Sequence, residues 1–220
     1  MLLLMLGCAP LYRPGIAPAP LFEEQGDLSA YSGVSLGGVQ GGVAWAPVEH
    51  VGLRANTQLA AEYAQLSAGV GGWLAGPFDR PPEERETGLR LGLWADAGVG
   101  RSSGGFSVTF SGGSTSTTHL SGQFVVVGGQ AVVAFEAPRA ASGLSLRGAV
   151  FRVEHDAGSD VQGIGRVGFL EPTLFARAGG PRLKAELQLG GWIPVWVPEE
   201  GATTGLPLPL HLGLGLVYER

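Results

Sequence analysis

Histidine, serine and acidic residues are the first candidates for chemistry, because together they can activate a nucleophile or hold a metal ion. The four histidines lie far apart and show neither the H-x-H nor the H-E-x-x-H spacing of a metal site. His119 and Ser121 are two residues apart, so a β-strand would place both side chains on one face, as a lipid hydrolase with a His/Ser pair would need. His155-Asp156 is a weaker pair of the kind used by proteases. Neither pair has an assignable third partner, so the sequence predicts no enzyme, no cofactor and no metal site.

The single cysteine of the chain stands at a position where a lipid could be attached. Met5-Leu6-Gly7-Cys8 resembles the bacterial lipobox, and signal cleavage before Cys8 would leave its thiol to carry acyl chains. Residues 1–7 are then the remnant of a signal peptide. Residues 8–26 contain four prolines and are expected to form a lipidated, Pro-rich linker that is semi-extended.

The composition excludes several classes of protein. Glycine makes up 38 of 220 residues, about 17% compared with roughly 7% in average proteins, and only 15% of the residues are charged. With 45% hydrophobic residues the chain is not intrinsically disordered, and its net charge of −5 argues against binding to nucleic acid. One cysteine excludes a disulfide framework and a cysteine-based zinc site. No run of apolar residues is long enough to predict a transmembrane helix.

Apolar residues alternate with other residues along most of the chain, which indicates β-strands with two different faces. In residues 89–99, one face holds leucine, alanine and valine, and the other holds Arg90, Trp94, Asp96 and two glycines. Mixed charges together with many glycines suit the crowded interior of a narrow barrel. The alternating segments are also longer than ordinary globular strands and fit the roughly 9–11 residues that a tilted strand needs to cross a membrane.

Residues 27–220 are therefore predicted to form an all-β domain, a transmembrane antiparallel β-barrel of about ten strands. Four of the segments alternate weakly, so eight or twelve strands also fit. A soluble periplasmic β-protein is an alternative that would require the apolar faces to pack against each other. The expected strands are residues 27–37, 39–47, 51–61, 64–75, 88–100, 118–136, 143–154, 166–178, 182–194 and 206–219.

The polar faces of these strands should line the lumen. Charges in a narrow lumen must pair, because burying a lone charge is costly, and the four cations and three anions nearly balance. A salt-bridged plug and a narrow polar path for ions or small solutes both fit this pattern. The interior of a ten-stranded barrel is only slightly wider than a filled eight-stranded one, which favours the plug. The predicted network consists of Arg54, Gln58, Arg90, Asp96, Glu171, Arg177, Lys184, Glu186, Gln188 and His211.

Local patterns add four further predictions. Residues 124–127 are apolar on both faces, which suggests a β-bulge. Residues 102–117 are rich in glycine, serine and threonine and should form a mobile loop. Short and long connections should alternate between the two rims. Aromatic residues near strand ends are expected to form girdles at the membrane interfaces, with Trp94 in the lumen instead. The expected girdle residues are Tyr31, Trp45, Trp73, Trp192, Trp196 and Tyr218.

Short motifs in the linker and first strands carry a resemblance to a known family. Residues 8–14 read C-A-P-L-Y-R-P, residues 20–26 read P-L-F-E-E-Q-G, and residues 39–53 read V-Q-G-G-V-A-W-A-P-V-E-H-V-G-L. With residues 169–172 and 187–190, these segments resemble a family of small lipid-anchored outer-membrane β-barrel proteins of Gram-negative bacteria. That family has no established activity, so the resemblance implies location and fold and supplies no catalytic residue.

The sequence thus predicts a lipid-anchored barrel of the cell outer membrane with a structural or interaction role and no evident catalysis. Its expected partners are outer-membrane lipid and the acyl chains on Cys8, and no protein partner can be named. A narrow channel or transporter is the first alternative. A barrel enzyme acting on lipid or peptide, with His119 and Ser121, is the second.

Overall fold

The computed structural model describes most of the predicted barrel domain. It covers residues 20, 25–35, 37–75, 88–109, 115–137, 139–156, 162–180, 182–196 and 210–219. Within the strands, the side chains of residues 74–75, 104–121, 153–167, 194 and 196 lie outside the description. Cys8 and almost all of the predicted linker also lie outside the described residues.

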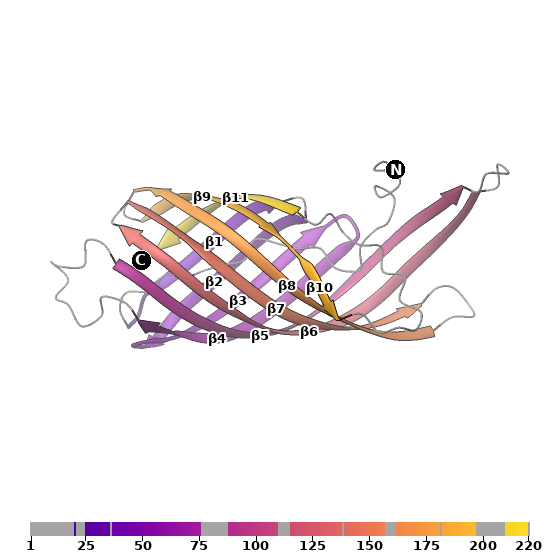
Figure 1. Cartoon of the computed structure of the whole chain (residues 1–220), viewed down its shortest axis with the longest axis horizontal. Coiled ribbons are helices and arrows are strands. Elements are labelled where there is room, and N and C mark those ends of the chain that lie inside the picture. The colour runs from indigo at the N-terminus through magenta and orange to yellow at the C-terminus, as the bar shows by residue number, and fades with distance from the viewer. Residues whose placement is uncertain are drawn as a thin grey trace.

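The described chain consists of strands and short turns, in chain order (Figure 1). No helix in these ranges is long and apolar enough to cross a membrane. The strands are β1 (Leu28–Ser35), β2 (Gly38–Val48), β3 (Val51–Ala60), β4 (Tyr63–Ala75), β5 (Gly88–Thr109), β6 (Thr115–Ala137), β7 (Ala140–Asp156), β8 (Gln162–Gly179), β9 (Leu183–Gly191), β10 (Ile193–Trp196) and β11 (Leu210–Glu219).

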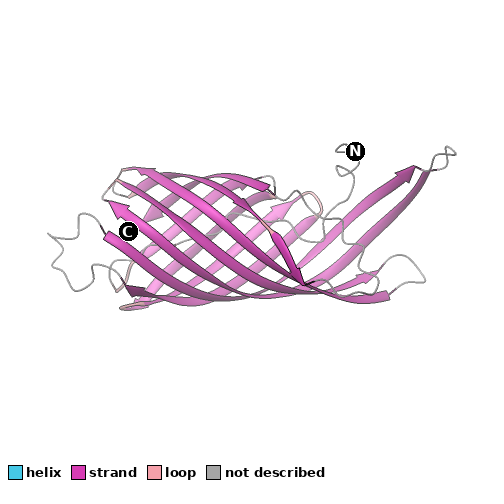
Figure 2. Ribbon diagram, in the orientation of Figure 1, coloured by secondary structure: helices cyan, strands magenta, loops and turns pink. Residues whose placement is uncertain are grey.

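The strands form one closed antiparallel barrel, as Figure 2 shows. Strands β1 to β8 pair in chain order, β9 pairs with both β8 and β11, and β11 pairs with β1 to complete the circle. β9 and β10 both pair with β8 and are separated only by Trp192, so together they act as one interrupted strand. The all-β fold and the expected number of ten strands are therefore confirmed.

The alternation of the sequence determines which side of the barrel each residue faces. In β9 the odd-numbered residues from Leu183 to Leu189 are exposed, and Lys184, Glu186 and Gln188 between them are buried. Among the strand side chains that the structure describes, 32 large apolar ones are exposed. The apolar faces therefore point outward and do not pack against each other, which contradicts the alternative of a soluble two-sheet protein.

Glycines on the inner face lie opposite large side chains of the neighbouring strand. Trp94 on β5 pairs in register with Gly71 on β4, and a Cβ built on Gly71 would lie 2.3 Å from the Trp94 ring. A side chain in a narrow lumen must lie flat over its neighbour, and only glycine leaves the space for it. Seven register pairs follow this rule: Tyr31 and Gly42, Trp73 and Gly92, Trp94 and Gly71, Asp96 and Gly69, Phe124 and Gly100, Phe175 and Gly143, and His211 and Gly190.

An aromatic layer lines the inner wall from β4 to the end of β9, toward the rim where β4 begins. Its rings contact one another in sequence from Tyr63 to Phe124, Phe151, Phe169 and Trp192, with centroid separations of 5.5, 5.8, 5.6 and 4.8 Å. All five side chains are buried. Phe124 and Val126 belong to this buried cluster while Val125 and Val127 are exposed. β6 therefore alternates normally although both of its faces are apolar.

Two sequence-based expectations, a β-bulge at residues 124–127 and the full set of girdle residues, are wrong because aromatic side chains occupy inward-facing positions. β6 keeps an unbroken register with β5 and β7, so there is no bulge at residues 124–127. The described register shifts lie near Trp45, Trp73 and Pro194 instead. Trp73 and Trp192 are buried in the lumen, and Tyr31 donates a hydrogen bond to Asn56 inside the barrel at 3.0 Å. Only Trp45 and Tyr218, among the expected girdle residues with described side chains, are exposed.

The two rims do not sort into short and long connections. The rim where β1 begins and β11 ends, called here the termini rim, has short turns at residues 49–50 and 180–182 but also the long connection 76–87. The opposite rim combines long connections with the short β1–β2 and β3–β4 turns. A Cβ on Gly38 would lie 2.2 Å from the carbonyl oxygen of Leu59, so the first of these turns needs glycine.

The expected loop at residues 102–117 is largely a two-stranded ribbon. β5 and β6 stay paired from Gly88 and Glu136 at the termini rim to Thr109 and Thr115 beyond the opposite rim. Figure 1 shows this hairpin, called here the arm, projecting past the ends of the other strands. Threonine, serine and valine favour extended backbone strongly enough that the glycines do not break the pairing.

Candidate functional site

A buried ion pair occupies the centre of the lumen. Arg54 on β3 donates from Nε to Oδ1 of Asp96 on β5 at 2.7 Å, and its Nη2 pairs with the second carboxylate oxygen. Asp96 reaches Arg54 across Gly69 of the intervening strand β4, which has no side chain to block it. The guanidinium also lies 4.6 Å from the centroid of the Trp94 ring. A two-pronged contact of this kind fixes the direction of both side chains.

Hydrogen bonds extend this central cluster around the barrel wall. Arg54 Nη1 donates to the amide oxygen of Gln130 on β6 at 2.6 Å. The amide nitrogen of Gln130 donates in turn to the hydroxyl of Ser145 on β7 at 2.6 Å. Four strands, β3, β5, β6 and β7, are therefore linked through one arginine, and almost all of the polar atoms involved have partners.

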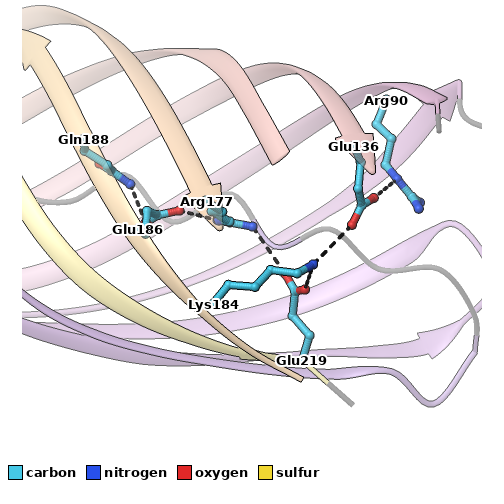
Figure 3. Close-up of polar contacts among 7 residues, drawn as sticks. All are labelled: Arg90, Glu136, Arg177, Lys184, Glu186, Gln188 and Glu219. Carbon is cyan, nitrogen blue, oxygen red and sulfur yellow. Dashed lines mark hydrogen bonds and ion pairs between the residues drawn. The ribbon is translucent and has the colours of Figure 1, made fainter. Parts of the chain in front are cut away.

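A second cluster of charges lies nearer the termini rim (Figure 3). Arg177 pairs through Nε with Glu186 and through Nη1 with Glu219, the latter at 3.4 Å. Lys184 Nζ lies 2.6 Å from Glu219 and 3.8 Å from Glu136, and Glu136 also pairs with Arg90. The amide of Gln188 donates to Glu186 at 2.9 Å. The cluster connects β5, β6, β8, β9 and the last strand, β11.

The lumen charges balance among the side chains that the structure describes. A separate contact of 3.5 Å joins Arg147 Nη1 to Glu171. With this pair, five cations face five anions: Arg54, Arg90, Arg147, Arg177 and Lys184 against Asp96, Glu136, Glu171, Glu186 and Glu219. All ten take part in at least one ion pair, which offsets the cost of removing them from water.

The structure places the side chains of all ten predicted lumen residues inside the barrel, each no more than 8% exposed. Seven of them fall into the two charge clusters, and Glu171 pairs with Arg147. Gln58 is not part of the ion pairs described above; it donates to the carbonyl of Gly37 at 3.0 Å and lines the cavity beside Arg54. His211 is also separate. Its imidazole lies over Gly190 near the Thr173 hydroxyl, and its two nitrogens have no hydrogen-bond partner among the described residues.

Sequence reasoning missed several members of the network, notably Glu136, Arg147 and Glu219. Glu136 lies in β6, whose inner face could not be recognised because both faces are apolar. Arg147 follows the alternation of its strand, since Ser145 before it and Ala149 after it are also buried. Glu219 stands at the last position of β11, where alternation has no following residue to support it.

Two small cavities lie beside these clusters in the described part of the lumen. A cavity of about 30 Å³ lies beside Arg54, bounded by Gln40, Gln65, Gln130 and Arg147 among others. Another of about 10 Å³ is lined by Pro20, Arg177, Glu186 and Val217 among others. A single water needs roughly 10–15 Å³ of such volume, so these cavities hold only a few waters. Pro20, from the predicted linker, is buried against the lumen wall.

The residues considered for catalysis lie near the arm. Ser121 on β6 is directly opposite Asp156 on β7, and His155 is opposite Gly122. Their side chains, and that of His119, fall outside the described part of the structure. Within the described residues, no group of three or more histidine, cysteine or acidic side chains could hold a metal ion.

Comparison with known proteins gives only distant structural matches. No protein-family model matches the sequence, and neither does any curated protein. The N-terminal β-barrel domain of Pseudomonas aeruginosa OprF aligns over 89% of this chain and 98% of its own, with 12% identity and a TM-score of 0.36. The β-domain of the Bordetella autotransporter BrkA aligns over 88% of this chain and 98% of its own, with 10% identity and a TM-score of 0.37. At these scores the matches do not reveal a function for this chain.

Proposed function

We propose that this protein is a membrane-spanning barrel of the bacterial outer membrane with a sealed, charge-paired lumen, and that its role is structural or one of interaction rather than transport. The observation that carries the proposal is the inversion of an ordinary globular fold. Large apolar side chains cover the outside, and paired charges fill the inside. An exposed apolar surface of this extent needs a lipid environment, because soluble monomers rarely expose patches above a few hundred Å².

The height of the apolar band supports the same proposal. On the outer face of β5 the residues from Leu89 to Val99 are leucine, alanine and valine, and exposed Arg101 follows them. Ten residue steps at about 3.4 Å, tilted by roughly 40°, correspond to about 26 Å along the barrel axis. Transmembrane barrels carry an apolar band of roughly 25 Å. Arg101 would then lie at the level of the lipid headgroups.

Packing supports a sealed lumen. The described cavities are too small for a continuous water column, and the five buried rings from Tyr63 to Trp192 occupy inner space on one side of them. A narrow channel for ions or small solutes is the second candidate, favoured by the cavity of about 30 Å³ beside Arg54. Conduction through such a channel would require the Arg54 and Asp96 side chains to separate so that water could enter between them.

Two measurements test the barrel and its lumen. The folded protein extracted from membranes should migrate differently on a gel before and after boiling in detergent, as closed barrels do. In planar bilayers the wild-type protein should show no stable conductance steps, while an Arg54→Ala/Asp96→Ala variant that empties the central lumen serves as the open control. Wild-type conductance that changes when Arg54, Arg90 or Asp96 is replaced would establish the channel instead.

Lipid attachment at Cys8 is a separate part of the proposal and rests on the sequence alone. Cells grown with a labelled fatty acid should incorporate label into the wild-type protein and not into a Cys8→Ser variant. The variant should still reach the outer membrane and shift its mobility on heating, since the barrel has its own apolar band. Label retained by Cys8→Ser would exclude this cysteine as the attachment site.

A further inference from the structure

The arm formed by β5 and β6 has two strand edges that pair with nothing else in the described structure. β4 accompanies β5 only as far as Ser102, and β7 accompanies β6 only from Ser121 onward. Six register pairs, from Gly104 and Leu120 to Thr109 and Thr115, therefore lie beyond both neighbours. At about 3.4 Å per residue this free part of the ribbon is roughly 20 Å long.

One hydrogen bond fixes which backbone groups of β5 point outward. The amide of Ser103 donates to the carbonyl of Glu62, just before β4, at 2.8 Å, so it points away from β6. Amides along a strand point alternately to its two sides. The outward amides and carbonyls beyond Ser103 therefore belong to Gly105, Ser107 and Thr109. On β6 the outward groups belong to the register partners of these residues, His119, Thr117 and Thr115.

The arm lacks the features with which proteins usually protect a free edge. Natural edge strands carry lysine, other charges, proline or bulges that prevent another strand from adding. Residues 102–121 contain no Lys, Arg, Asp, Glu or Pro, and the β5–β6 register is unbroken to its end. A two-stranded ribbon is also only marginally stable alone, so a third strand would stabilise it.

We propose that the free β5 edge of the arm is a docking site for an extended, uncharged segment of a different protein, which adds as a third strand in line with β4. Backbone donors and acceptors repeating at the spacing of a strand recognise extended backbone and not lipid or sugar. The three outward residues offer three amides and three carbonyls, enough for six hydrogen bonds. The absence of charge in the arm selects a segment that is itself uncharged. On the β5 side, the β3–β4 turn at residues 61–62 makes its last backbone contact with β5 at Ser103, and the edge is open beyond that residue.

The probe is a synthetic peptide with the sequence of residues 115–123, T-S-T-T-H-L-S-G-Q, which already pairs with β5 on its inner edge. Hydrogen exchange of individual amides is measured by NMR on the full-length protein in detergent micelles. With the peptide at about ten times its Kd, exchange at Gly105, Ser107 and Thr109 should slow by about tenfold. Exchange at the outward amides of β6 should not change.

Proline variants provide matched controls. Ser107→Pro removes an outward amide of β5 without removing a β5–β6 hydrogen bond, and it should abolish peptide binding. Thr117→Pro makes the same change at the partner position on β6 and should leave binding intact, as should Ser107→Ala. A variant in which a two-residue Asn-Gly turn replaces residues 104–120 should keep the heat-dependent gel shift of the barrel and lose binding.

Three results would overturn the proposal. One is equal loss of binding in Ser107→Pro and Thr117→Pro, and another is full binding by the variant without the arm. The third is protection of the β5 amides that appears without peptide as the protein concentration rises, because the occupant would then be a second copy of this chain.

Discussion

Replacing Asp96 by asparagine should destabilise the barrel by about 3 kcal/mol, because it leaves the Arg54 guanidinium charged and buried. Breaking a buried ion pair by removing one partner typically costs about 3–5 kcal/mol. The side chain of Arg54 is 2% exposed and that of Asp96 is 6% exposed, and the cavity beside them has room for only a few waters, so bulk water does not solvate the charge left behind. The lower end of the range is expected because Arg54 keeps the Gln130 oxygen at 2.6 Å and the Trp94 ring.

A double-mutant cycle distinguishes the interaction energy of the Arg54–Asp96 ion pair from the separate effects of the two substitutions. Arg54→Met alone should cost about 3 kcal/mol, since it leaves the Asp96 carboxylate without its cation. The double variant removes both charges and should also cost about 3 kcal/mol, not about 6, which gives a coupling of about 3 kcal/mol. Urea titrations of the protein refolded into lipid vesicles, followed by tryptophan fluorescence, measure each value.

The matched control is Arg101→Gln, which neutralises an exposed arginine of the same strand as Asp96 and should change stability by less than about 0.5 kcal/mol. Single substitutions that add within about 0.5 kcal/mol would refute the reasoning. Additivity would mean that water reaches the pair and screens it, and the lumen would then be hydrated as a channel requires.

Three further substitutions test the packing of the lumen, each by the same unfolding titration. Gly100→Ala should cost about 1–3 kcal/mol, because its Cβ would lie 2.2 Å from the Phe124 ring, whereas Gly148→Ala, with its nearest contact at 4.0 Å, should be nearly neutral. Equal effects at the two glycines would show that ring contact is not what selects glycine. Phe151→Ala should cost about 3–5 kcal/mol by opening a cavity in the aromatic layer, and Val150→Ala on the outer face less than about 1 kcal/mol; the reverse order would place the stabilising contacts outside. Glu219→Gln should cost about 1.5 kcal/mol, less than Asp96→Asn, since Arg177 keeps Glu186 and Lys184 keeps Glu136. A loss as large as that of Asp96→Asn would contradict this sharing of partners.

Much of the barrel could be predicted because lipid and lumen impose opposite demands on successive residues. In β3, β5, β9 and β11 the outward face is mostly apolar and the inward face is mostly polar or glycine, with Trp94 and Val217 as inward exceptions, so period-two alternation defines the strands and their inner residues. Arg54, Asp96, Lys184 and Glu186 follow directly from this rule. Alternation indicates the face of a residue and not its partner, so the pairing of Arg54 with Asp96 across β4 needed the three-dimensional structure.

The errors at β6, Trp73 and Trp192 share one physical cause, which is that part of the lumen is apolar. Where rings fill the interior, as at Phe124 and Phe151, both faces of a strand carry apolar residues and the alternation disappears. Trp73 and Trp192 were expected at the membrane interface because tryptophan near a strand end usually lies there. Tryptophan also suits a lumen where a glycine of the next strand makes room for it, as Gly92 does for Trp73.

The pairing of large side chains with glycines inside the barrel determines the register of neighbouring strands, which the uniform apolar outer surface cannot do. If β4 slipped by two residues against β5, every leucine and valine would still face lipid, and the membrane could not distinguish the two arrangements. Inside, the same slip would bring Trp94 opposite Trp73 or Gly69 in place of Gly71. A slip that places Trp94 opposite Trp73 forces two indole rings into the space of one. A slip in the other direction places Trp94 opposite Gly69, so that Asp96 loses this glycine as its partner. The glycines of the inner face therefore fix the register of neighbouring strands. A deletion of two residues in β4 would keep apolar residues on the lipid-facing side, and only the misplaced side chains in the lumen would destabilise the barrel.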